Sequence, residues 1–187
     1  MEGDVAPIAK QFDLQGDPCD IAPIPAGHIN DTYVLTTRAG ETTARYVLQR
    51  INHHVFRDPP GVMANILRVT EHICTRLTRI DPALARRQLR VIPTRDGQGC
   101  HRDPAGDFWR MYPYIENAVT YDTAPSVEMA REAARMFALF QGLLRDPPPA
   151  ALHETIPGFH DALRRLEYFR RVLDKDALNR AQGAAPE

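Results

Sequence analysis

The sequence predicts an α+β fold in which a small antiparallel sheet comes first and helices follow. Three short β-rich runs, at residues 20–24, 33–35 and 44–51, are joined by a glycine-containing loop and then by a tight turn, which is the pattern of a β-meander. After Ile115 the strand-like runs stop, and apolar residues recur at helical spacing instead. Strands and helices that are segregated along the chain in this way are typical of α+β proteins rather than of doubly wound sheets.

Capping residues and apolar spacing predict three amphipathic helices. Asp58-Pro59 marks the start of the first, because proline suits the first turn of a helix, and apolar residues recur every three or four positions through residues 62–77. The second covers residues 126–145, with a serine at its N-cap, and the third covers residues 159–173. We expect the last two helices to expose apolar surface that a complete helical lobe would cover.

Two more strand-like runs, at residues 88–94 and 108–115, flank a polar turn. The turn contains Gly97 and Gly99 but lacks the following helix that a dinucleotide-binding fingerprint requires. We therefore expect a five-stranded antiparallel sheet crossed by one helix, which is the layout of a protein-kinase-like N-terminal lobe, followed by the first helices of an incomplete helical C-terminal lobe. The expected parts are an N-terminal arm (1–19), the kinase-like lobe (20–116) and the partial helical lobe (117–187).

Composition and charge narrow the range of partners. The net charge is −1 and 43% of the residues are hydrophobic, whereas a dedicated nucleic-acid or membrane-surface binder usually has a basic excess. No apolar run approaches the roughly 20 residues that span a bilayer, and the first residues do not have the pattern of a signal peptide. The three cysteines are odd in number and widely spaced, so reduced thiols are expected. We expect a cytoplasmic protein with no nucleic-acid or membrane partner.

Two segments carry a resemblance to a known family. The first lies in the loop between the first two predicted strands, the second in the third strand, and shorter matches lie at residues 55–59, 65–72 and 156–161. The two main segments are Gly27-His28-Ile29-Asn30-Asp31-Thr32-Tyr33-Val34 and Tyr46-Val47-Leu48-Gln49-Arg50-Ile51-Asn52. Together these segments resemble the aminoglycoside-phosphotransferase and choline-kinase superfamily, and within it the N-acetylhexosamine 1-kinases, over about residues 20–175.

The resemblance implies an ATP- and Mg²⁺-dependent phosphotransferase. Its partners would be a nucleotide and a small-molecule sugar acceptor, and the reaction would phosphorylate the anomeric hydroxyl of an N-acetylhexosamine. An aminoglycoside, choline or homoserine acceptor is the alternative within the same class. A non-catalytic nucleotide-binding remnant, or a structural α+β domain with accidental matches, remains open outside it.

The loop of the first segment is the candidate phosphate-binding element. Gly27 permits close approach of backbone N–H groups to a phosphate, and Asn30 and Thr32 add side-chain donors. His28 and Asp31 join the candidate set because they belong to the same matched run. An ordinary hairpin loop is the alternative interpretation.

The third strand should supply a cation for the α- and β-phosphates. Strand alternation places Leu48 and Arg50 on one face and Val47 and Gln49 on the other. We favour Arg50, with Gln49 beside it, because Leu48 would then be free to pack against adenine. The alternative is that Arg50 is a solvated charge.

The helix and the fifth strand provide the remaining candidates. Glu71 is the only carboxylate in the body of the first helix, so it is the candidate to hold the strand cation, although a solvent-facing role is the alternative. Tyr112, Tyr114 and Ile115 belong to a segment that would form the adenine-recognising hinge, or else to ordinary core strand and turn.

The sequence lacks the His-x-Asp-x-x-x-x-Asn catalytic loop that the resemblance implies. Asp174 and Asn179 match part of this spacing, but no histidine precedes them and they continue an amphipathic helix, so we interpret the match as chance. No catalytic or metal-binding residue is therefore assigned. The Mg²⁺ ligands are expected outside this chain, which we expect to be a fragment or truncated product that is inactive alone.

Overall fold

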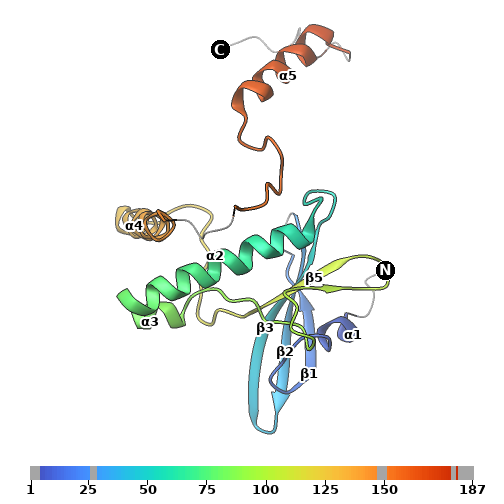
Figure 1. The fold of residues 1–187 in the computed structure, drawn as a ribbon, viewed down its shortest axis with the longest axis vertical. Helices are drawn as coiled ribbons and strands as arrows, with labels where there is room; N and C mark the ends of the chain where they lie inside the picture. The colour runs from blue at the N-terminus through green and yellow to red at the C-terminus, as the bar shows by residue number, and fades with distance from the viewer. Residues whose placement is uncertain (1–4, 26–28, 147–150, 178–179, 181–187) are drawn as a thin grey trace. The chain divides into compact units, whose positions relative to one another are not determined.

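The computed structural model describes residues 5–25, 29–146, 151–177 and 180. It divides into two compact units, Met1–Thr155 and Ile156–Glu187. The first unit contains every strand and the helices α1 to α4, and the second contains α5 (Figure 1).

A five-stranded antiparallel sheet forms the centre of the first unit, with the strand order β1-β2-β3-β5-β4. The α+β prediction, with an antiparallel sheet followed by helices, is confirmed. The β2–β3 connection is a tight turn at Gly40, whose φ of +61° suits glycine. The strands are β1 (Asp17–Pro23), β2 (Asp31–Ala39), β3 (Thr42–Ile51), β4 (His101–Arg102) and β5 (Phe108–Pro113).

The prediction of a strand at residues 88–94 is wrong. The fourth strand is instead the two-residue β4, which lies just after the polar turn. Within 88–94, the N–H of Ile92 donates to Met111 at 2.9 Å, and Thr94 forms an isolated bridge with Phe12. Pro93 has no N–H to donate, so the segment runs beside β5 without forming a ladder.

The two faces of the sheet differ in what covers them. Directly paired residues of neighbouring strands point to the same face, so the register places Leu35, Tyr46, Leu48 and Met111 on one side. All four are buried in one hydrophobic cluster with Ala9 and Phe12. We refer to this side as the covered face. The opposite side carries Thr32, Val34, Val47, Gln49 and Arg110, which are partly exposed, and also Ile51 and Tyr112, which are buried. We refer to it as the open face.

The first residues of the chain belong to the core of the sheet. Helix α1 (Ala6–Ala9) is short, and Ala9 and Phe12 have no exposed surface. The N–H of Asp13 donates to Pro93 at 2.9 Å. The stretch that we expected to be an arm therefore covers one face of the sheet, and β1 already begins at Asp17.

The long helix between β3 and β4 is placed where the sequence predicts it. Helix α2 (Pro59–Ile80) is capped by Asp58, whose Oδ1 accepts from the N–H of Gly61 at 3.0 Å. Helix α3 (Pro82–Arg86) follows at once, and no helix was predicted there. On the far half of α2, Ile73 and Leu77 pack against Leu143 in a second cluster.

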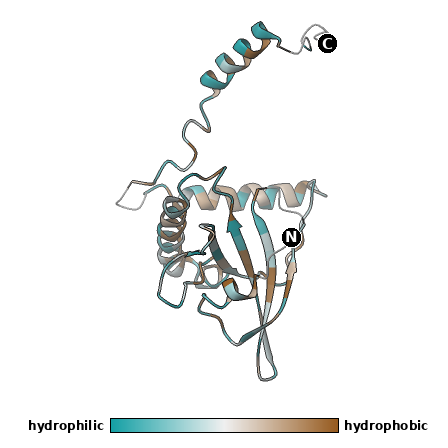
Figure 2. Ribbon diagram, turned by 90° about the vertical axis from the view of Figure 1, so that its right-hand side faces the viewer, coloured by the Kyte–Doolittle hydropathy of each residue, from teal (hydrophilic) through white to brown (hydrophobic). Residues whose placement is uncertain are grey.

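Helix α4 (Val127–Leu143) begins at its predicted cap, Ser126, whereas α5 (Ala162–Lys175) begins after Asp161, later than the predicted start at residue 159. Only Leu143 of α4 is buried, and α5 buries none of its described side chains. The expected exposure of apolar side chains on both helices is confirmed. The hydropathy colouring shows that hydrophobic residues recur along both helices (Figure 2). Within the described residues, no helix combines the length and the apolar character that crossing a membrane requires.

Candidate functional site

Polar side chains gather on both faces of the sheet at the end where β2 begins and β3 ends. Asp31 pairs with Arg50 and Thr32 pairs with Gln49 across the two strands. Alternation sends the first pair to the covered face and the second pair to the open face. The two groups therefore lie on opposite faces at the same end of the sheet.

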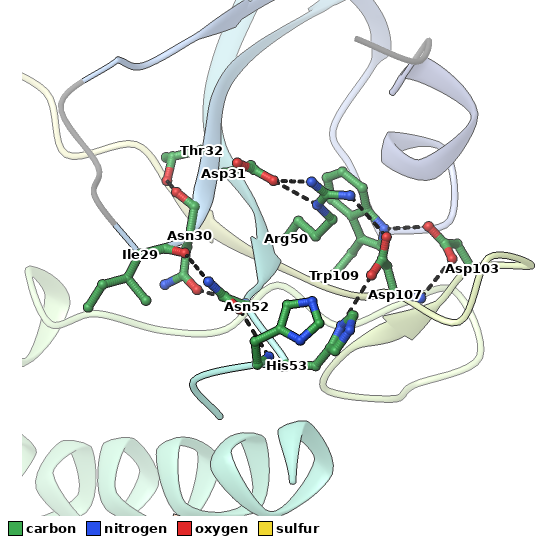
Figure 3. Close-up of polar contacts among 11 residues, drawn as sticks. Ile29, Asn30, Asp31, Thr32, Arg50, Asn52, His53, Asp103, Asp107 and Trp109 are labelled. Atoms are coloured by element: carbon green, nitrogen blue, oxygen red, sulfur yellow. Dashed lines mark hydrogen bonds and ion pairs between the residues drawn. The ribbon is translucent and has the colours of Figure 1, made fainter. Parts of the chain in front are cut away.

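The group around Arg50 is a connected set of polar side chains (Figure 3). Nε of Arg50 donates to Oδ2 of Asp31 at 2.7 Å, and Nη1 donates to Oδ2 of Asp107 at 3.0 Å. Nδ1 of His53 lies 3.3 Å from the second carboxylate oxygen of Asp107. We call these four residues the Arg50 cluster. Hydrogen bonding to Asp31 is the main reason that the pKa of Arg50 is raised above its usual value.

The β4–β5 hairpin holds Asp107 in position. The N–H of Asp107 donates to Oδ1 of Asp103 at 2.9 Å, and the indole N–H of Trp109 donates to Oδ2 of Asp103 at 2.8 Å. Burial alone would raise the pKa of Asp103, but these donors and nearby backbone N–H groups stabilise the carboxylate and lower it. Asp103 thus acts as an ionised anchor for the hairpin.

The Arg50 cluster is unfavourable for a phosphate. One guanidinium faces two carboxylates, so a phosphate would have to displace Asp31 or Asp107 from Arg50 and would be repelled by the other. The ion pairs are partly exposed, and each contributes no more than about 1 kcal/mol. The repulsion between like charges, rather than the strength of the existing bonds, is the obstacle.

The loop leading into β2 is fixed to the end of β3 by two asparagines. Oδ1 of Asn30 accepts from the N–H of Asn52 at 3.0 Å, and the side-chain amide of Asn52 donates to the carbonyl of Ile29 at 3.0 Å. Both Gly27 and His28 lie outside the described residues. The side-chain oxygen of Asn30 thus holds the loop. A phosphate would be bound by the side-chain N–H groups of Asn30, and this predicted role stays a prediction.

The open face carries a row of hydrogen-bonded side chains that crosses three neighbouring strands. Nε2 of Gln49 donates to Oγ1 of Thr32 at 3.0 Å, and Nε of Arg110 donates to Oε1 of Gln49 at 3.1 Å. The three residues are in register on β2, β3 and β5, and we call them the open-face row. Next to the row, the guanidinium carbon of Arg110 lies 5.4 Å from the ring centre of Tyr112.

Two predicted site residues are placed where they cannot act as expected. Leu48 has no exposed surface, because it packs in the core of the covered face, so it offers nothing to an adenine ring. Glu71 is exposed on α2 and lines a separate hollow with Thr75 and Gln88. The carboxylates that hold Arg50 are instead Asp31 and Asp107.

The predicted hinge segment is tied to β3. The N–H of Tyr114 donates to the carbonyl of Arg45 at 3.0 Å, and the Arg45 guanidinium lies 4.2 Å from the centre of the Tyr114 ring. Arg45 also forms a two-point ion pair with Glu116. Tyr112 is buried, which raises its pKa, whereas Ile115 is 59% exposed. Of the three hinge candidates, Ile115 is thus the one with a freely accessible side chain.

Sequence reasoning missed Arg110 and Asp107. A signal for Arg110 was available, because alternation within 108–113 places it on the same face as Tyr112. No local signal identified Asp107, which meets Arg50 across a separation of 57 residues. The chance-match interpretation of Asp174 agrees with its position inside α5, and Asn179 lies outside the described residues.

No family model matches the sequence. Among the residues that the structure describes, no group of three or more His, Cys, Asp or Glu side chains is arranged to hold a metal ion.

Proposed function

We propose that this chain is the ATP-binding part of a small-molecule kinase of the aminoglycoside-phosphotransferase and choline-kinase type. One observation carries the proposal. The antiparallel sheet has the strand order β1-β2-β3-β5-β4, and a long helix, α2, lies between β3 and β4 along the chain. In protein kinases a Gly-rich loop covers the phosphates, and a lysine on the third strand forms an ion pair with a glutamate on a helix. The loop at 24–30 and the polar ends of β2 and β3 are the matching parts of this chain.

The acceptor is the finer part of the proposal. The resemblance of the loop and third-strand segments favours the anomeric hydroxyl of an N-acetylhexosamine, with ATP and Mg²⁺ as the other reactants. In this assignment the chain contributes nucleotide binding, since its sequence has no His-x-Asp-x-x-x-x-Asn segment. Positioning and charge neutralisation supply most of the catalysis in phosphoryl transfer, so nucleotide binding is separable from turnover and can be measured alone.

Isothermal titration of the full 187-residue chain with MgATP tests the proposal. We expect saturable binding at millimolar or lower nucleotide and weaker binding of adenosine, which lacks the phosphates. A flat titration at several millimolar MgATP would overturn the assignment in favour of a domain with accidental motif matches. A parallel ³¹P NMR assay with N-acetylglucosamine and MgATP should detect no sugar phosphate. Formation of sugar phosphate by this chain would contradict the proposal that it binds nucleotide but does not catalyse phosphoryl transfer.

A further inference from the structure

We propose that the open-face row is a polyphosphate-binding site, with Arg110 of β5 supplying the positive charge. The inference rests on the proposed function for the identity of the ligand as a nucleoside triphosphate. It differs from the assignment that the sequence favours, in which Arg50 of β3 meets the phosphates. The two arginines lie on opposite faces of the same end of the sheet, so they make different predictions.

The charge of Arg110 is not balanced by a carboxylate. Arg110 takes part in none of the ion pairs identified between described residues. Arg110 is also partly buried. A partly desolvated guanidinium attracts an anion more strongly than an exposed one, because solvent screens it less.

The row orients the guanidinium for an anion. Nε of Arg110 is used to bond Oε1 of Gln49, and this bond, together with the ring of Tyr112 nearby, restricts the rotation of the side chain. The planar edge with the two terminal nitrogens then remains for the two-point bonding that guanidinium groups form with phosphate oxygens. Gln49 is itself held by Thr32 at the start of β2.

The row also lies beside the described ends of the candidate loop. Thr32 is the second residue of β2, and its Oγ1 donates to the carbonyl of Asn30 at 3.4 Å. The N–H of Ile24, on the other side of the loop, donates to the carbonyl of Thr32 at 2.8 Å. Both ends of the loop therefore converge on the first residue of the row.

Two apolar side chains continue from the row along the same face. Val34 and Val47 are paired across β2 and β3. The two valines are partly exposed and belong to neither buried cluster, whereas Tyr112, which is paired with Val47, is buried. Accessible valines next to a positive charge suit a ligand with an aromatic base and a phosphate tail.

The experiment compares charge-matched variants by isothermal titration with MgATP and, separately, with adenosine. We expect Arg110→Gln to weaken MgATP binding about tenfold or more, as expected for loss of a charge-assisted contact, and to change adenosine binding by less than about twofold. Arg50→Gln, which removes the rival cation, and Arg38→Gln, an exposed charge on β2, should both leave MgATP affinity within about twofold of the parent.

The possible results separate the inference from the proposed function. If the parent chain binds no MgATP, the proposed function fails. If the parent binds and Arg50→Gln loses the affinity while Arg110→Gln keeps it, only the open-face assignment is overturned. If Arg110→Gln does not fold, the Nε–Hε NMR signals of the unmutated chain decide: MgATP should shift the Arg110 signal and leave that of Arg50 in place, and the opposite pattern would overturn the inference.

Discussion

Replacing Phe12 by alanine tests whether the first residues of the chain are part of the folding unit. Phe12 has no exposed surface and packs with Leu48, Trp109 and Met111 on the covered face. The backbone around it is also tied down, because Phe12 bridges Thr94. If this description is correct, Phe12→Ala removes a ring from the centre of the core rather than from a loose arm.

The size of the effect follows from the buried area. The Phe12 ring removes on the order of 150 Å² from water beyond what alanine would, which at about 25 cal/mol per Å² corresponds to about 4 kcal/mol. Measured Phe→Ala substitutions in cores cost about 3–5 kcal/mol, which agrees with this value. A domain is stable by only about 5–15 kcal/mol, so the variant should be near the limit of folding.

Urea denaturation followed by tryptophan fluorescence is a suitable assay. Trp109 is the single tryptophan and lies in the same cluster as Phe12, so its emission reports on this core and not on α5. With a urea dependence of about 2 kcal/mol per M, the transition midpoint should fall by about 2 M.

Phe137→Ala is the matched control. Phe137 is 63% exposed on α4, so its loss should change stability by no more than about 0.5 kcal/mol and leave the midpoint within about 0.3 M. A midpoint shift for Phe12→Ala as small as that of the control would refute the placement of the first residues in the core.

Two further predictions concern the backbone and the hinge. Gly16 and Gly97 both have positive φ (+82° and +79°), but a Cβ at Gly16 would lie 2.5 Å from the carbonyl oxygen of Arg38, whereas nothing lies within 4 Å of a Cβ at Gly97. Gly97→Ala should therefore cost only the conformational strain of about 1 kcal/mol, and Gly16→Ala clearly more; equal midpoints in urea would contradict this. The ion pair with Arg45 lowers the pKa of Glu116, so it stabilises the fold fully above pH 4.5, the usual value, and less as the pH falls through the lowered pKa. Glu116→Gln should remove this part of the pH dependence of the melting temperature between pH 7 and 3. If the melting temperatures of the variant and the parent depend on pH in the same way, the Arg45–Glu116 ion pair does not stabilise the fold.

Local signals in the sequence were sufficient for the three longest helices and for the first three strands, but not for α1 and α3. Asp58, Ser126 and Asp161 each cap a helix by accepting a backbone N–H three residues ahead, and such bonds depend only on neighbours in the chain. The same holds for the turn at Gly40. The strand-like run at 88–94 was an equally local signal, but the strand predicted from it is wrong, because a strand forms only where a neighbouring strand pairs with it.

Long-range contacts decided what the sequence could not. Phe12 was not recognised as a core residue, because its partners lie on β3 and β5. The charge state around Arg50 was likewise hidden, because Asp107 comes from the β4–β5 hairpin. Propensity and periodicity act over a few residues, whereas these contacts depend on how the sheet is assembled.

The sequence by itself determined that Leu48 and Arg50 share one face of β3 and that Gln49 lies on the other, since side chains alternate along any strand. Only the tertiary structure decided which of these faces is covered. The residues around Phe12 bury the face of Leu48 and leave Gln49 and Arg110 partly exposed. The physical reason is that the apolar side chains of the first residues must pack against one side of the sheet, and the pattern along β3 does not specify which side that is.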